Sequence, residues 1–101
     1  MDYGAADDVS GAVCNDIQAP KDYRVIFFND DYTTMEFVVQ VLMSIFHKSA
    51  DEAELLMRTV HKNGSAVVGV YTYDIAATRA MLTMKQAKAH GFPLRCEVEA
   101  V

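Results

Sequence analysis

The chain lacks several features that define large classes of protein. Nine lysines and arginines face fourteen aspartates and glutamates, the net charge is −5, and the basic residues nowhere form a run. There is also no stretch of about 18 apolar residues, the length needed to cross a bilayer. We therefore expect neither nucleic acid nor a membrane as a partner.

Cysteine is equally scarce. Cys14 and Cys96 lie near opposite ends of the chain, without the spacing of a metal site. We interpret both as free thiols in a reducing compartment. Residues 1–19 have neither the basic start nor the apolar stretch of a signal peptide. The sequence therefore predicts a cytoplasmic protein, or a plastid protein if an import sequence has been removed.

The composition changes at about residue 20. Residues 1–19 are small, polar and acidic, with no helical or alternating apolar pattern. Such a segment buries too little apolar surface to offset its ordering entropy, so we predict a flexible N-terminal tail. The tail is either without a role or a mobile arm for a partner. Residues 20–101 are predicted to form one domain that folds alone.

The apolar pattern of this domain predicts six elements. Strands are expected at residues 22–28, 66–71 and 92–98, the first buried on both faces and the second with Gly69 marking a bulge or a close backbone approach. A helix from residue 34 to about 47 is apolar on all sides and is expected to be central and mostly buried. Further helices are expected from residue 50 to 61 or 62, and from Thr72 to His90-Gly91.

Two capping boxes are predicted at the starts of the first two helices. Thr33 and Glu36 have the spacing of one, and Ser49 and Glu52 that of the other. The order β-α-α-β-α-β then predicts an α+β fold, a two-layer sandwich with a three-stranded antiparallel sheet packed against three helices. The first two helices, joined by a very short turn, are expected to pack as a hairpin.

One acidic stretch, Asn29-Asp30-Asp31, separates the first strand from the first helix. On the second helix Met57, Val60 and His61 share a face, because they are spaced i, i+3 and i+4. If the imidazole is neutral, the acidic stretch and His61 offer hydrogen-bond acceptors that suit an ammonium group. The neighbouring methionines and valine form an apolar wall. The sequence predicts a site for an amine attached to a hydrophobic side chain, although a lone His61 is also compatible with a purely structural role.

Three blocks of this sequence resemble the ClpS adaptor family. They are N-D-D-Y-T-T-M-E-F-V at 29–38, L-M-x-x-V-H at 56–61 and P-L-x-C at 93–96, and the resemblance covers about residues 20–98. It implies a non-catalytic adaptor without cofactor or metal. Such an adaptor binds proteins with a free N-terminal Leu, Phe, Tyr or Trp and delivers them to a ClpA- or ClpC-type AAA+ unfoldase with its ClpP peptidase. We expect the chain to act as a monomer.

The resemblance also implies roles for individual residues. One group would bind the substrate's α-amino group and first peptide bond, with Asp31 supporting the loop: Asn29, Asp30, Asp31 and His61. A second group would line the hydrophobic side-chain pocket, with Met35 as a gate against β-branched side chains: Thr33, Met35, Val38, Met57, Val60 and Leu94.

The chain departs from the family pattern in two places. Thr34 occupies a position that is usually proline, which suits a first helical turn, so affinity or selectivity could differ. The family's unfoldase-contacting charged pair is matched only in charge, by Asp74 and Arg79. Asp74 and Arg79 either make that contact or belong to an ordinary solvated helix face.

The sequence leaves three alternatives open. The element order is shared with the C-terminal domain of the ribosomal stalk protein, which would make the chain a different interaction domain. In the second alternative, the chain is a paralogous adaptor with an altered N-terminal residue preference. In the third, Asp30, Asp31 and His61 would bind a divalent metal for hydrolysis. The absence of a further His or Glu cluster, and of a nucleophile paired with a base, argues against an enzyme.

Overall fold

The computed structural model describes residues 21–101. The elements are β1 (Asp22–Phe28), α1 (Met35–Ser44), α2 (Ala50–Asn63), β2 (Ser65–Thr72), α3 (Tyr73–Ala89) and β3 (Arg95–Ala100). The predicted order is confirmed, although the last strand begins and ends later than expected. The predicted tail and Cys14 lie outside the described residues.

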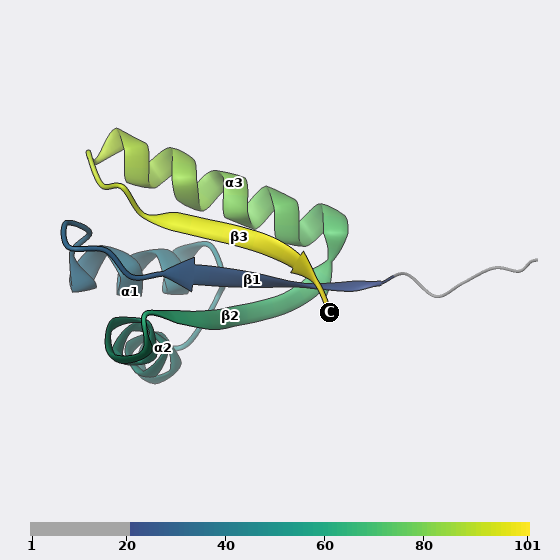
Figure 1. Ribbon diagram of the computed structural model, residues 1–101, viewed down its shortest axis with the longest axis horizontal. Helices are drawn as coiled ribbons and strands as arrows, with labels where there is room; N and C mark the ends of the chain where they lie inside the picture. The colour runs from purple at the N-terminus through teal and green to yellow at the C-terminus, as the bar shows by residue number, and fades with distance from the viewer. Residues whose placement is uncertain (1–20) are drawn as a thin grey trace, which may run out of the picture.

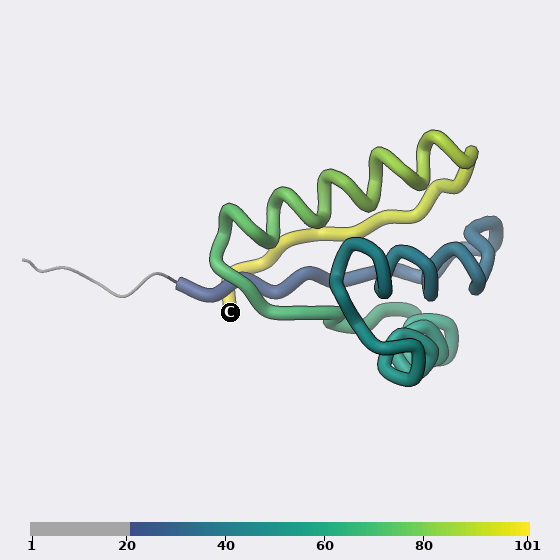
Figure 2. Tube along the Cα trace, turned by 180° about the vertical axis from the view of Figure 1, so that it is seen from behind, coloured from purple at the N-terminus to yellow at the C-terminus, as the bar shows by residue number. Residues whose placement is uncertain are grey.

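The three strands form one antiparallel sheet in the order β2-β1-β3, with β1 in the centre. The helical layer lies behind the sheet in Figure 1 and in front of it in Figure 2, which confirms the two-layer sandwich. The predicted irregularity at Gly69 is present. Val25 pairs with Gly69 and Ile26 with Val67, which leaves Val68 as the extra residue of a bulge.

Within residues 21–101, the central strand β1 is covered on one face only. Val25 and Phe27 are fully buried beneath the helices, whereas Ile26 and Phe28 on the opposite face are half-buried. The Arg95 guanidinium lies 4.2 Å from the centre of the Phe28 ring and shields part of that face. The prediction that β1 is buried on both faces is therefore wrong, because an apolar run does not show whether a second layer exists.

Helix α1 is buried along one side rather than all round. Its inward residues Phe37, Val38, Val41 and Leu42 are buried in the hydrophobic core. Met35, at its start, keeps 49% of its surface exposed. The helix also ends earlier than predicted, at Ser44. The prediction of a mostly buried helix is wrong because no other element of the described residues covers the outer side of α1.

The chain turns sharply between α1 and α2. His47 has a left-handed φ of 56°, and the Lys48 amide donates to the Leu42 carbonyl at 3.0 Å. Ser49 then begins α2 with the predicted capping box to Glu52. Helix α2 is seen nearly end-on in Figure 1, whereas α1 runs along the sheet. The two helices therefore pack in contact, as expected of a hairpin, but cross steeply.

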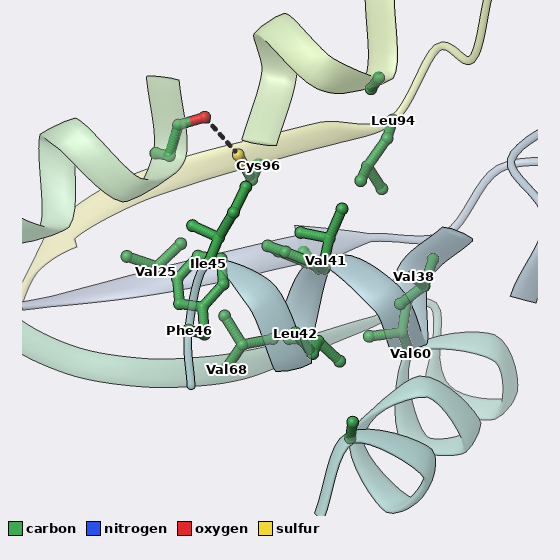
Figure 3. Packing of buried hydrophobic residues seen from close by; sticks show 14 of the residues in the cluster. Val25, Val38, Val41, Leu42, Ile45, Phe46, Val60, Val68, Leu94 and Cys96 are labelled. Carbon is green, nitrogen blue, oxygen red and sulfur yellow. Dashed lines mark hydrogen bonds between the residues drawn. The ribbon is translucent and has the colours of Figure 1, made fainter. Parts of the chain in front are cut away.

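Helix α3 approaches the sheet through small residues. Its buried positions are Ala76, Ala80, Thr83 and Ala87. Cys96 of β3 is a buried free thiol whose Sγ donates to the Ala80 carbonyl at 3.4 Å (Figure 3). Burial raises the pKa of this thiol to about 11, so at neutral pH it is protonated and weakly nucleophilic.

Candidate functional site

The loop between β1 and α1 is organised by the Asp30 carboxylate. Its Oδ1 accepts from the Tyr32 amide at 2.8 Å and from the Thr33 amide at 2.7 Å. Its Oδ2 accepts from the Thr33 hydroxyl at 2.7 Å. Burial by itself would raise the pKa of this carboxyl, but the hydrogen bonds from Thr33 and Tyr32 outweigh burial and lower it. Asp30 is therefore ionised at neutral pH and holds the loop in one conformation.

These hydrogen bonds correct the predicted start of α1. Thr33 is not the N-cap, because its hydroxyl is used by Asp30. Thr34 takes that position with extended backbone angles, and its hydroxyl accepts from the Phe37 amide at 3.2 Å. The threonine that stands where the family usually has proline therefore caps the helix. Asp30 supports the loop through these hydrogen bonds, whereas the supporting role that the resemblance implies for the exposed Asp31 stays a prediction.

The other end of the loop is tied to helix α2. The Asn29 amide donates to the Gly64 carbonyl at 2.8 Å. Gly64 ends α2 with a left-handed φ of 89°, and its own amide donates to the Val60 carbonyl. The conformation at Gly64 therefore sets where the acidic loop begins relative to Val60 and His61 in the last turns of the helix.

Replacing Gly64 with alanine is expected to destabilise both the fold and the site. A left-handed backbone disfavours a side chain, so Gly64→Ala should lower the free energy of unfolding by about 1 kcal/mol. Gly91→Ala is the matched control, because Gly91 has a φ of 77° in a different loop. In urea denaturation both variants should lose similar stability, whereas only Gly64→Ala should weaken binding of an amine attached to a hydrophobic side chain, the ligand class that the sequence predicts for this loop. Equal affinity of the two variants would show that the Asn29–Gly64 link does not shape the site.

A cavity of about 400 Å³ opens between this loop and the two helices. The loop and the start of α1 line one part, and α1 and α2 supply an apolar wall. Its lining consists of Asn29, Asp30, Asp31, Tyr32, Thr33, Thr34, Met35, Val38, Met57, Val60 and His61. Residues from two segments that are distant in the sequence, 29–38 and 57–61, therefore meet around one hollow.

Most residues of the predicted site lie around this cavity, with one exception. Val38 and Val60 lie beside each other at the edge of the core in Figure 3. Leu94 belongs to the same core cluster, is only 6% exposed and does not line the cavity. Its contribution to a side-chain pocket stays a prediction.

Two residues of the lining were missed by the sequence reasoning. Tyr32, which is 75% exposed, and Thr34 both line the cavity. They belong to the same N-D-D-Y-T-T-M block as the predicted residues, so their position within a short loop was the available signal.

The chemistry of the cavity favours a cation with an apolar substituent. No lysine or arginine lines it, whereas two carboxylates, an asparagine amide and an imidazole do. An ionised carboxylate can accept about four hydrogen bonds, so Asp30 keeps one acceptor site beyond the three used by the loop. Met35, Met57, Val38 and Val60 offer adjoining apolar surface.

The two predicted unfoldase-contact residues both lie on α3. Asp74 is exposed in its first turn, and the Arg79 guanidinium lies 4.7 Å from the centre of the Tyr71 ring. Five residues along a helix correspond to about 140° of rotation at 3.6 residues per turn, so the two side chains leave different sides of α3. Figure 1 shows that α3 begins at the opposite end of the molecule from the β1–α1 loop.

Within residues 21–101, no helix is both long and apolar enough to cross a membrane. Within the same range, no three His, Cys, Asp or Glu side chains are grouped as metal ligands would be. The metal-dependent alternative therefore receives no support from the described part of the chain.

The fold and the cavity define the class of protein. A small α+β domain that presents an open hollow, acceptor-rich on one side and apolar on the other, is a ligand-binding domain. Comparison with known proteins identifies which family of binding domains this is. Residues 18–97 match the profile of the family described as ATP-dependent Clp protease adaptor protein ClpS.

Individual relatives agree with the family match. The chain is 57% identical over 82 residues to the ATP-dependent Clp protease adapter protein ClpS of Treponema denticola, covering 81% of each chain. It is 51% identical to ClpS of Acetivibrio thermocellus, over 83% of this chain and 85% of that one. The solved structure of Agrobacterium tumefaciens ClpS2 bound to L-phenylalaninamide superposes with a TM-score of 0.80 at 44% identity, covering 82% of this chain and all of that one.

The chain therefore belongs to the ClpS family of Clp protease adaptors. Membership of this family argues against the alternative that the chain is an interaction domain like the C-terminal domain of the ribosomal stalk protein. The family is one of adaptors rather than enzymes, in agreement with the expected non-catalytic role.

Proposed function

We propose that this adaptor binds proteins whose free N-terminal residue is Leu, Phe, Tyr or Trp. It would deliver them to a ClpA- or ClpC-type AAA+ unfoldase with ClpP, as a cytoplasmic monomer. The observation that carries the proposal is the cavity that joins the acidic loop to the Met57 and Val60 wall. The relative bound to L-phenylalaninamide, a ligand with one amine and one aromatic side chain, supports the same ligand chemistry here.

Each part of the cavity has a proposed role. The α-ammonium group donates to Asn29, to the remaining acceptor site of Asp30 and to the His61 imidazole. The first side chain of the substrate enters between Val38, Met57 and Val60. Met35 lies at the start of α1 with 49% of its surface exposed and lines the same cavity, which suits a gate that contacts the Cβ region of the bound residue.

The two halves of the cavity must act together. Burial of a leucine or phenylalanine side chain contributes about 1.5–3 kcal/mol. A hydrogen bond to a charged group contributes about as much. Since a dissociation constant of 1 mM already requires about 4 kcal/mol, either half alone binds only weakly. Selectivity for an N-terminal hydrophobic residue then follows from requiring both an amine and an apolar side chain.

The contact with the unfoldase is proposed at the start of α3. Asp74 and Arg79 are the residues carried over from the family pattern. Their position at the far end of the molecule from the β1–α1 loop (Figure 1) leaves the cavity accessible while α3 is engaged. An unfoldase pull-down comparing Asp74→Ala with wild type addresses this contact separately from substrate binding.

A titration with peptides that differ only in their first residue tests the substrate preference. Fluorescence anisotropy should show Phe- and Leu-led peptides binding at least about tenfold more tightly than Ile- or Val-led peptides, because a β-branched side chain collides with Met35. The Met35→Ala variant should reduce this difference, whereas Met81→Ala, which changes an exposed methionine on α3, should preserve it.

Three outcomes of that titration are distinguishable. Equal affinity for all first residues would contradict the proposed function. Tight binding with a different order of preference would instead favour the paralogous adaptor. Loss of discrimination in both methionine variants would remove Met35 as the gate.

A further inference from the structure

An apolar groove adjoins the cavity on the outer side of the helices. It lies between α1 and α2 and has a volume of about 680 Å³. Met35, Val39 and Met43 of α1 and Ala50 and Met57 of α2 form its apolar lining. We call it the α1/α2 groove.

The groove and the cavity share a boundary. Met35 and Met57 line both of them, so a chain that leaves the cavity over these two residues enters the groove directly. The groove continues along α1 as far as Ser44, where the chain turns toward α2. A helix of ten residues is about 15 Å long, and an extended chain advances about 3.3 Å per residue. The groove therefore has room for about four extended residues.

We propose that the α1/α2 groove binds the segment that follows the N-terminal residue of the substrate, at about its third to sixth positions, and favours apolar side chains there. This proposal rests on the proposed function, because the first residue must occupy the cavity for the next ones to reach the groove. Three of the lining side chains are methionines, and Met43 is 42% exposed. Flexible thioethers adapt to side chains of different shapes, which suits a surface that meets many different substrate sequences.

The N-terminal segment of the chain itself is a poorer occupant. Residues 1–20 contain four aspartates and no lysine or arginine. Glu36 and Glu54 also line the groove, so this segment would bring like charges together. A substrate segment has no such constraint.

The test uses the full chain and two six-residue peptides. Both begin with phenylalanine and are otherwise neutral, but one carries leucine and the other serine at positions three and five. By fluorescence anisotropy the leucine peptide should bind about fivefold more tightly, a difference of about 1 kcal/mol. Phenylalaninamide serves as the reference ligand, because it fills the cavity without reaching the groove.

Two methionine variants provide the matched comparison. Met43→Gln should remove the advantage of the leucine peptide without changing the affinity for phenylalaninamide. Met81→Gln makes the same change at an exposed position of α3 and should leave both affinities as in wild type. Failure of phenylalaninamide to bind would overturn the proposed function itself, whereas its binding without any leucine advantage would overturn only the groove.

Two further measurements distinguish the substrate segment from other occupants of the α1/α2 groove. A synthetic peptide of residues 1–19 that displaces the leucine peptide, but not phenylalaninamide, would assign the groove to the chain's own N-terminal segment. Dimerisation in analytical ultracentrifugation that Met43→Gln abolishes would assign it to a second copy. Either result would overturn the proposal.

Discussion

Acetylating the amine of a Phe-led peptide is expected to weaken its binding at least about a hundredfold. Acetylation removes the positive charge and two of the three N–H donors, while the acetyl group occupies space beside the acidic loop. Each hydrogen bond to a charged group contributes about 1.5–3 kcal/mol, so the loss of two exceeds the roughly 2.7 kcal/mol of a hundredfold change. Isothermal titration calorimetry of the free and acetylated peptides measures the effect.

A methylated amine is the control for that experiment. N-methylation retains the charge and two donors, so it should weaken binding much less than acetylation does. If the acetylated peptide binds within about threefold of the free peptide, the acceptor-rich side of the cavity does not recognise an ammonium group. The proposed roles of Asn29, Asp30 and His61 would then be wrong together.

The Asp30→Ala variant is expected to lose about a hundredfold in affinity for phenylalaninamide. The substitution removes the acceptor of three hydrogen bonds, which leaves the Tyr32 and Thr33 amides and the Thr33 hydroxyl without their partner. The loop should then sample other conformations, and the cavity loses a carboxylate that is ionised at neutral pH. Loop disorder and the missing charge both act against binding.

Asp31→Ala is the matched control for Asp30→Ala. Asp31 is the next residue in the loop and is exposed, so its removal changes the net charge equally. We expect Asp31→Ala to change affinity by less than about threefold in the same titration. Similar losses in the two variants would mean that overall negative charge, rather than the ordered loop, attracts the ligand.

The stability that Asp30 contributes should depend on pH. Its pKa in the folded chain lies below the ordinary value of 3.8. The carboxylate therefore contributes to stability above about pH 4, and this contribution is lost as pH falls through the lower folded value. At the neutral pH used for the titrations, the contribution is fully present.

Two neighbouring threonines, Thr33 and Thr34, differ in the roles that the sequence predicts and the structure assigns. Spacing alone gave Thr33 and Glu36 the pattern of a capping box, yet Thr34 caps α1. The pattern could not show that Asp30 would take the Thr33 hydroxyl, because this depends on the conformation of the loop. Ser49 has no such competitor, and its capping box was predicted correctly.

The exposure of apolar side chains also could not be predicted from the local sequence. The apolar positions of β1 and α1 were identified from the sequence, but their exposed sides were not. Met35 and Met43 look like core residues in a hydrophobic pattern, and the structure leaves both partly exposed beside the α1/α2 groove. Leu94 lies within the core, and its predicted contribution to the pocket stays a prediction. Whether an apolar side chain is covered depends on elements that are distant along the chain.

The amino-acid order by itself determined the six elements, the α+β class and the acceptor-rich character of the loop after β1, since these depend on local periodicity, capping and side-chain chemistry. Only the tertiary structure decided that the loop after β1 and the last turns of α2 enclose one cavity, and that a groove continues from it. The strand order and the steep crossing of α1 and α2 set the distances between the loop after β1, the last turns of α2 and the groove. No local pattern specifies them, because they arise from how the helices pack on a sheet with one open face.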